Sequence, residues 1–245
     1  TDFLQIALQP YREGGEKDLT DLLETRVINA VDFSAAAIGQ TRVVILANVS
    51  KLRLGQLNEL QTFVKDGGGV LIFGGDQIDQ RWYNDQLLPY GLLPARLGPL
   101  ADKRKNTEPF TRIMVQRFDN PALEIFSNPR NGDLASAEIR QWHRTLENPD
   151  DDLVRPLARL ETGDAFIIEK KYGNGRVLFC ATACDDAWST LPLRPFFVPF
   201  AQRLCTYLAS SVMPPRNLGV GEKALAQFPL SHAGREITVL DTEGK

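Results

Sequence analysis

The sequence predicts an α/β fold in which helices flank a mostly parallel sheet, with a short β-rich C-terminal arm after it. Two continuous apolar runs, RVVILANV and VLIF, are typical of strands that are buried on both faces of a sheet. An amphipathic stretch of helical period lies between them, which is the order of a βαβ unit. A third apolar run follows an Asn-Gly turn signal further along the chain.

The first half of the chain supplies the βαβ unit. We expect Asp2–Leu8 to be a short helix or strand, and the alternating apolar positions of Val27–Phe33 predict another strand. The buried strands of the unit are predicted over Arg42–Val49 and Val70–Phe73. The amphipathic helix between them is predicted over Arg53–Lys65, and a right-handed crossover then makes the two strands parallel neighbours.

The middle of the chain is less regular. Residues 98–112 are expected to form an exposed loop, because they are polar and include the basic run Lys103-Arg104-Lys105. Ile113–Phe118 alternates between apolar and polar positions, and Ser136–Leu146 is predicted to be a short helix.

The sequence of the last third of the α/β domain predicts a hairpin and a helix. The hairpin pairs Ala165–Lys170 with Arg176–Ala181 around a turn at Tyr172–Gly175. A helix with an apolar face is predicted over Pro195–Ser210, with a kink at Pro199.

Two units are expected, an α/β domain over residues 1–213 and, over residues 214–245, a linker with the opening strands of a following β-rich segment. The second unit is too short to bury a core of its own. The chain opens on TDFLQIALQP without a Met, and we expect it to be part of a longer protein.

The composition excludes several classes of function. A net charge of −3 over 245 residues gives no electrostatic case for binding nucleic acid or anionic lipid. The three cysteines are odd in number and show no CxxC pattern, and there are two histidines, so neither a disulfide framework nor a metal site is expected. No cofactor is expected either.

The segment VKDGGGVLIFGGDQID places glycine clusters on both sides of a buried strand. A phosphate-binding loop is excluded because two acids, Asp76 and Asp79, follow Gly74-Gly75 where that loop needs a Lys. A nucleophile elbow also needs glycines on both sides of a sharp turn, but it carries Ser or Cys at the turn. The sequence therefore predicts an elbow that has kept its glycines and lost its nucleophile.

Three roles remain open for Asp76. In one interpretation the glycines serve only to let the chain turn sharply, with Asp76 as a helix N-cap. A carboxylate is also able to act as nucleophile or base. That role needs partners, for which the candidates are Asp79, Asp185, Asp186 and His143.

Residues 1–213 resemble the class I glutamine-amidotransferase-like, flavodoxin-like fold. The motifs that carry the resemblance are VVILANVSKL, FVKDGGGVLIFGGD, YNDQLLPYGLLPARLG and GRVLFCATACDDAW. They look most like the extracytoplasmic domain of membrane-anchored bacterial proteins that are related to the Bacteroides aerotolerance family and contain a von Willebrand A-type domain. In this fold a further strand normally precedes the helix that TDFLQIAL would form.

The resemblance implies a Cys at the elbow and a His after the last core strand. This chain has Asp76 at the first position and the stretch CATACDDAW, with Cys184 and Asp185, at the second. His143 is expected in a loop-and-helix segment away from the strand ends. The amidotransferase pair is thus missing, and catalysis of that type is not expected.

The expected function is a non-catalytic interaction or sensing domain on the outer, periplasmic face of a bacterial cell. Its expected partners are proteins or other domains of the same chain, with membrane contact only through segments outside these residues. One alternative is a binding module for a small, carbohydrate-like ligand that contacts Trp82, Tyr83 or Trp188. The other is an unorthodox hydrolase that uses Asp76.

Overall fold

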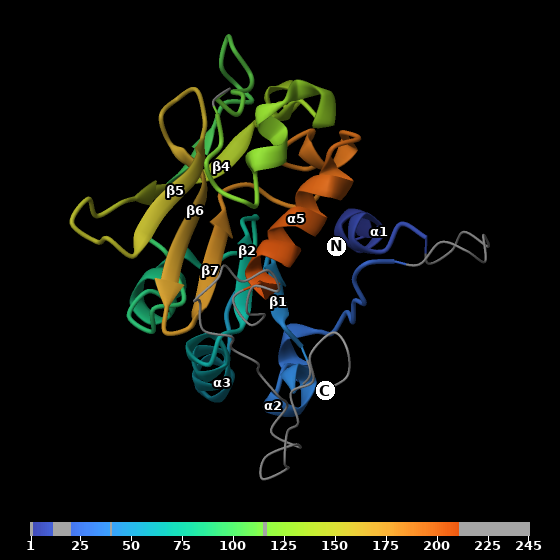
Figure 1. Ribbon diagram of the computed structural model, residues 1–245. Coiled ribbons are helices and arrows are strands. Elements are labelled where there is room, and N and C mark those ends of the chain that lie inside the picture. The colour runs from blue at the N-terminus through green and yellow to red at the C-terminus, as the bar shows by residue number, and fades with distance from the viewer. Residues whose placement is uncertain (1, 12–20, 40, 115–116, 211–245) are drawn as a thin grey trace, which may run out of the picture.

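The computed structural model describes residues 2–11, 21–39, 41–114 and 117–210. The predicted linker and arm over residues 214–245 lie outside the described residues. The described residues form two sheets, and the larger one lies at their centre (Figure 1). The strands are β1 (Val43–Ala47), β2 (Gly69–Phe73), β3 (Arg96–Asp102), β4 (Gln141–Leu146), β5 (Val154–Arg159), β6 (Ala165–Tyr172) and β7 (Gly175–Cys180).

The larger sheet has five strands in the order β1-β2-β7-β6-β5. The first three are parallel, with Val43 opposite Gly69 and Val70 opposite Val177. The strands β6 and β5 complete the sheet in antiparallel pairing. The predicted fold class is confirmed, because the three apolar runs are neighbouring parallel strands of one sheet with helices packed on it.

The predicted helices Arg53–Lys65 and Pro195–Ser210 are present within one or two residues of their expected bounds, and Asp2–Leu8 is a helix. The helices are α1 (Asp2–Leu8), η1 (Ala30–Asp32), α2 (Ala35–Ile38), α3 (Leu54–Lys65), α4 (Gln80–Trp82), η2 (Tyr83–Leu87), η3 (Glu124–Ser127), η4 (Pro129–Asn131), η5 (Leu134–Ser136), η6 (Leu191–Leu193) and α5 (Phe197–Ala209). Figure 1 shows α5 lying across the sheet beside α1. Pro199 falls in the first turn of α5, where main-chain N–H groups have no helical partner, so the helix has no need to kink there.

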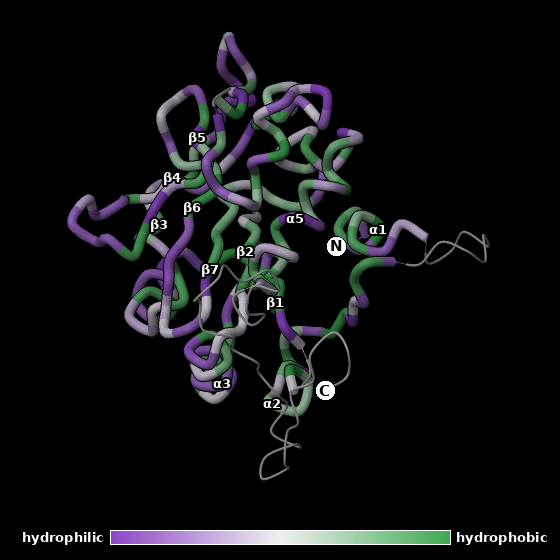
Figure 2. Tube along the Cα trace, in the orientation of Figure 1, coloured by the Kyte–Doolittle hydropathy of each residue, from purple (hydrophilic) through white to green (hydrophobic). Residues whose placement is uncertain are grey.

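The core follows from the apolar runs, which appear as green segments along the central strands in Figure 2. Every residue of β2 is buried, as expected for a central parallel strand. One carboxylate, that of Glu169 on β6, is fully buried within this sheet. It accepts hydrogen bonds from the Tyr207 hydroxyl at 2.5 Å and from Arg155 Nε at 2.7 Å, which compensate its loss of water.

The predicted strand over Val27–Phe33 is wrong. The structure has η1 in its second half, and the side chains of Val27 and Val31 are 60% and 62% exposed. Alternation alone does not make a strand when no neighbouring strand pairs with it. Instead, the Gln56 side chain of α3 donates hydrogen bonds to the main-chain oxygens of Ala30 and Phe33.

Two predictions for the middle of the chain also need correction. Ser136–Leu146 is not a helix, because its second half is β4, which pairs antiparallel with β3. The strand β3 in turn occupies the first residues of the predicted loop 98–112. The pairing of two distant segments overrides a weak local preference. Ile113–Phe118 makes an isolated bridge between Ile113 and Leu160, and residues 115–116 lie outside the described part.

Within the described ranges, no helix has the length and apolar character needed to span a bilayer.

Candidate functional site

The elbow follows β2, where the chain turns at Gly74 and Gly75. The Gly74 N–H donates to the main-chain oxygen of Cys180 at 2.9 Å, which ties the turn to the end of β7. A Cβ on Gly74 would lie 2.7 Å from the Ala181 oxygen, and one on Gly75 would lie 2.1 Å from Asn48 Cγ. Glycine is therefore needed at both positions because neighbouring atoms leave no room for a Cβ. Neither residue has a positive φ.

Asn48 organises the turn from the neighbouring strand end. Its φ of 53° makes it the one non-glycine residue with positive φ among the described residues, a conformation that Asn tolerates better than most side chains. Its Nδ2 donates to Asp76 Oδ1 at 2.8 Å, and its Oδ1 accepts from the Gln77 N–H at 2.9 Å. Sequence reasoning missed Asn48, although an Asn directly after a buried strand was a usable signal.

Asp76 is exposed, and its one hydrogen bond among the described residues is the one from Asn48. It is not a helix N-cap; Asp79 has that role, because its carboxylate accepts from the Trp82 N–H at 3.0 Å. Asp185 instead accepts from the Ala187 N–H at 3.1 Å in its own loop. No hydrogen bond joins Asp76 to a second titratable side chain in the described part of the chain.

His143 lies at the elbow, which corrects its expected place in a loop-and-helix segment. It belongs to β4, is 5% exposed, and donates a main-chain hydrogen bond to the Ala181 oxygen at 2.9 Å. Its Nε2 lies 3.2 Å from the Gly75 oxygen, and since a carbonyl only accepts, Nε2 carries the proton. The pairing of β4 with β3, which the local sequence does not reveal, brings His143 to the strand ends.

The ring of His143 is enclosed. It packs against Trp188 and Phe179 with ring centres 5.2 Å and 6.4 Å away, and its Nδ1 is buried without a hydrogen-bond partner. Burial lowers the pKa of His143, while the hydrogen bond to Gly75 opposes that shift. The imidazole is therefore neutral at physiological pH.

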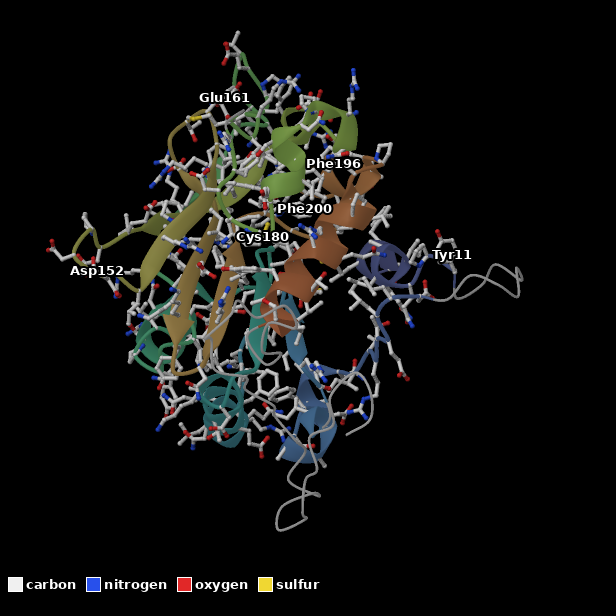
Figure 3. All side chains as sticks on the ribbon, viewed as in Figure 1. Tyr11, Asp152, Glu161, Cys180, Phe196 and Phe200 are labelled. Carbon is white, nitrogen blue, oxygen red and sulfur yellow. The ribbon has the colours of Figure 1, made fainter. Side chains whose placement is uncertain are left out.

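The cysteines do not supply a nucleophile. Burial raises the pKa of the Cys184 thiol to about 11 and that of Cys180 to about 12. Figure 3 places Cys180 in the interior of the molecule, where its side chain has no exposed surface. A thiol with so high a pKa is protonated at neutral pH and reacts slowly, because the thiolate is the nucleophile.

The three aromatic residues expected to contact a ligand differ in how far they are buried. Tyr83 and Trp188 are buried, and the Tyr83 hydroxyl donates to the Val49 oxygen at 2.6 Å. Trp82 is half-buried and meets Tyr83 edge to face. Only Trp82 offers part of its ring to the surface.

A surface pocket of about 500 Å³ lies just beyond the elbow. It is lined by Ile78, Asp79, Gln80, Arg81, Asn84, Asp85 and Arg96. Asn84 is held by two hydrogen bonds to the main chain of Leu97, at 2.7 Å and 2.9 Å. In the described ranges, no group of three or more His, Cys, Asp or Glu side chains is arranged to hold a metal ion.

Comparison with known proteins gives no family assignment by sequence. No family model matches the chain, and no curated protein matches it. Solved structures do match. The cytoplasmic protein STM3548 from Salmonella typhimurium is 15% identical, with a TM-score of 0.62 over 84% of this chain and 85% of its own. The cytoplasmic protein STM1381 from Salmonella typhimurium LT2 is 13% identical, with a TM-score of 0.63 over 84% and 86%.

A ThuA-like protein from Bacteroides uniformis is 13% identical over 75% of this chain and 74% of its own, with a TM-score of 0.43. For the two Salmonella proteins, identities this low together with TM-scores above 0.6 establish a shared fold and not a shared activity. This chain has an α/β fold in which helices flank a mostly parallel sheet, similar in architecture to the two Salmonella proteins.

Proposed function

We propose that this chain is a non-catalytic interaction or sensing domain. The observation that carries the proposal is that the buried His143 contacts the turn at the carboxyl ends of the parallel strands, the place where open α/β sheets usually bind ligands. The strand β4 lies across it, with His143 bonded to Gly75 and to Ala181. Gly74 and Gly75, at the turn, are both buried.

The chemistry of the elbow supports the same proposal. Amide hydrolysis by this fold needs a thiolate and a base that takes up and returns a proton. Asp76 stands at the turn, and Cys184 is a buried thiol. His143 Nε2 is engaged with a carbonyl and its Nδ1 is enclosed, so neither nitrogen is placed to serve Asp76.

The proposal includes the cellular location of the domain. The motif resemblance supports an extracytoplasmic domain of a larger, membrane-anchored bacterial protein, whose partners are proteins or other domains of the same chain. Immunodetection of the intact protein in fractionated cells tests this setting. Recovery in the soluble cytoplasmic fraction would contradict it.

The absence of catalysis is tested with purified protein and glutamine. We expect ammonia release equal to that of a buffer control for the wild type and for Asp76→Ala. Losing nucleophile and base together removes far more than the ~10² to 10⁴-fold that general base catalysis alone contributes. Turnover that disappears in Asp76→Ala would overturn the proposal and favour the hydrolase that uses Asp76.

A second candidate function is favoured by the pocket beyond the elbow. Its lining carries both charges and a fixed amide, Asn84, which suits a polar, carbohydrate-like ligand. A screen of mono- and oligosaccharides by calorimetry, comparing wild type with Asn84→Ala and Asp85→Ala, tests it. A sugar whose affinity falls at least tenfold in both variants would support this candidate, and no measurable heat with any sugar would exclude it.

A further inference from the structure

The pocket beyond the elbow has walls that hydrogen bonds hold together. The main-chain oxygen of Leu97, in β3, accepts from Gln80 Nε2 at 3.0 Å and from Asn84 Nδ2 at 2.9 Å. The Leu97 N–H donates to Asn84 Oδ1 at 2.7 Å. These three bonds fix α4 and η2 against the start of β3, so the pocket is formed before a ligand enters it, as small-molecule sites usually are.

One wall of the pocket contains a π-helix, η2. The Leu88 N–H donates to the Tyr83 oxygen, five residues earlier, at 2.9 Å. Turns of this kind are rare and occur frequently at functional sites. This one supplies Asn84 and Asp85 to the lining. The π-helix is therefore an observation, independent of the cavity itself, that indicates binding at this place.

The lining of the pocket consists mainly of charged side chains. Four of the seven lining residues are Asp79, Arg81, Asp85 and Arg96, and Ile78 is the one apolar residue. Among the described residues, no carboxylate pairs with the Arg96 guanidinium. Arg81 and Asp85 form a pair at 3.6 Å, but their side chains are 92% and 51% exposed, so water weakens their attraction. Groups of both signs are thus free to bind a ligand.

We propose that this pocket binds a small dipolar ion, a dipeptide whose amino and carboxyl ends are both free. Its carboxylate binds the Arg96 guanidinium, a planar donor that suits both carboxylate oxygens at once. Its ammonium group binds Asp85 and Oδ2 of Asp79, since Oδ1 of Asp79 accepts from the Trp82 N–H. The inference rests on the proposed function, because it gives a sensing domain the class of its ligand.

The arrangement of the charges favours a dipeptide over smaller or uncharged ligands. Arg96 belongs to β3, whereas Asp79 and Asp85 belong to the segment that carries α4 and η2. The two ends of a dipeptide separate its charges, while a free amino acid carries both on one carbon and fills little of a pocket of about 500 Å³. A neutral sugar brings no counter-charge to these side chains, so the electrostatic match is better with a dipolar ligand.

The probe is the dipeptide L-alanyl-L-alanine, titrated into the protein at neutral pH and followed by NMR. We expect saturable shifts of the side-chain amide signals of Gln80 and Asn84, which line the pocket. Two control ligands each lack one charge: N-acetyl-L-alanyl-L-alanine has no ammonium group, and L-alanyl-L-alaninamide has no carboxylate. Each should bind more weakly by about tenfold or more, because each has lost one charge-assisted set of hydrogen bonds.

Protein variants assign each end of the dipeptide to its partner. Arg96→Gln should weaken binding of the dipeptide by about tenfold or more, and should change binding of the alaninamide form by less than about threefold, since that form has no carboxylate. The double variant Asp79→Asn, Asp85→Asn should weaken the dipeptide by a similar factor and leave the acetylated form nearly unaffected. An asparagine at position 79 still accepts from the Trp82 N–H, so α4 keeps its N-cap.

Matched controls for these variants are Arg130→Gln and Glu124→Gln. Both residues are exposed, and neither lines the pocket. They remove the same kinds of charge from the surface elsewhere, so both should bind the dipeptide as the wild type does. Unchanged NMR signals away from the pocket show that each variant keeps its fold.

Three results would overturn the inference. They are the absence of shifts at Gln80 and Asn84 with millimolar dipeptide, equal binding of the dipeptide and both end-blocked forms, and an affinity that Arg96→Gln leaves unchanged. A sugar that shifts these signals while the dipeptide does not would assign the pocket to the carbohydrate-like candidate. Ammonia release is a separate readout, so failure of the dipeptide test leaves the proposed lack of catalysis standing, and turnover of glutamine would leave the dipeptide result standing.

Discussion

His143 Nε2 lies 3.2 Å from the main-chain oxygen of Gly75, which joins the second, smaller sheet to the turn after β2. This contact makes the stability of the fold depend on the protonation state of the buried His143 imidazole. A proton added at Nδ1 would be buried there without a hydrogen-bond acceptor.

We predict that the protein loses stability in mild acid through His143. Burial holds its folded pKa below 6.5, so the unfolded chain takes up a proton at a pH where the folded protein does not. The free energy of unfolding is therefore unaffected well above pH 6.5. It falls as pH drops through 6.5 toward the folded pKa, by up to about 1.4 kcal/mol per pH unit.

The measurement is urea unfolding at a series of pH values for wild type and His143→Gln. Glutamine keeps an N–H for the Gly75 oxygen and does not titrate. The slope of stability with pH should be smaller in the variant by the contribution of His143. Equal slopes in the two proteins would show that His143 is not the group responsible.

We predict that Gly74→Ala destabilises the fold by about 1 to 3 kcal/mol, the usual cost of overpacking. The new Cβ would lie 2.7 Å from the Ala181 oxygen, a main-chain atom that moves only if the end of β7 moves. Gly55→Ala is the control, because its Cβ meets nothing within 4 Å and it lies in α3. That variant should gain up to about 1 kcal/mol, and a neutral Gly74→Ala in thermal melts would contradict the close approach at the elbow.

We predict that Tyr207→Phe lowers the free energy of unfolding by about 1 to 3 kcal/mol, the cost of leaving a buried polar group short of a partner. The Tyr207 hydroxyl donates to Glu169, and it accepts from Asn120 Nδ2 at 3.0 Å. Tyr90→Phe is the matched control, since Tyr90 is only partly buried and its hydroxyl has no hydrogen bond among the described residues. Chemical denaturation measures both variants. An equal decrease in the free energy of unfolding in the two would show that the hydrogen bonds around Glu169 do not stabilise the fold.

We predict that none of the three cysteines reacts with a thiol reagent in the native protein at neutral pH. Burial raises the pKa of Cys184 to about 11, and those of Cys180 and Cys205 to about 12. All three should react once denaturant is added, which a colorimetric thiol assay counts directly. Rapid native labelling of Cys184 would show an accessible thiolate and reopen the question of a nucleophile near the elbow.

Local sequence determined the elements that depend on short-range pattern. The apolar runs of β1, β2 and β7 and the amphipathic faces of α3 and α5 were predictable, because burial on a sheet imposes a composition on the segment itself. The crowding at Gly74 and Gly75 was also predictable, since paired glycines after a buried strand mark a close approach of main chain.

Tertiary structure alone decided what occupies the end of the sheet. The pairing of β3 with β4 joins residues 39 to 50 positions apart, and it makes a strand of the segment predicted as a helix, the strand that carries His143 to Gly75. The same holds for Val27–Phe33, whose alternation found no partner strand in the described part of the chain. Strand pairing is a property of two segments at once, so neither segment's sequence contains it.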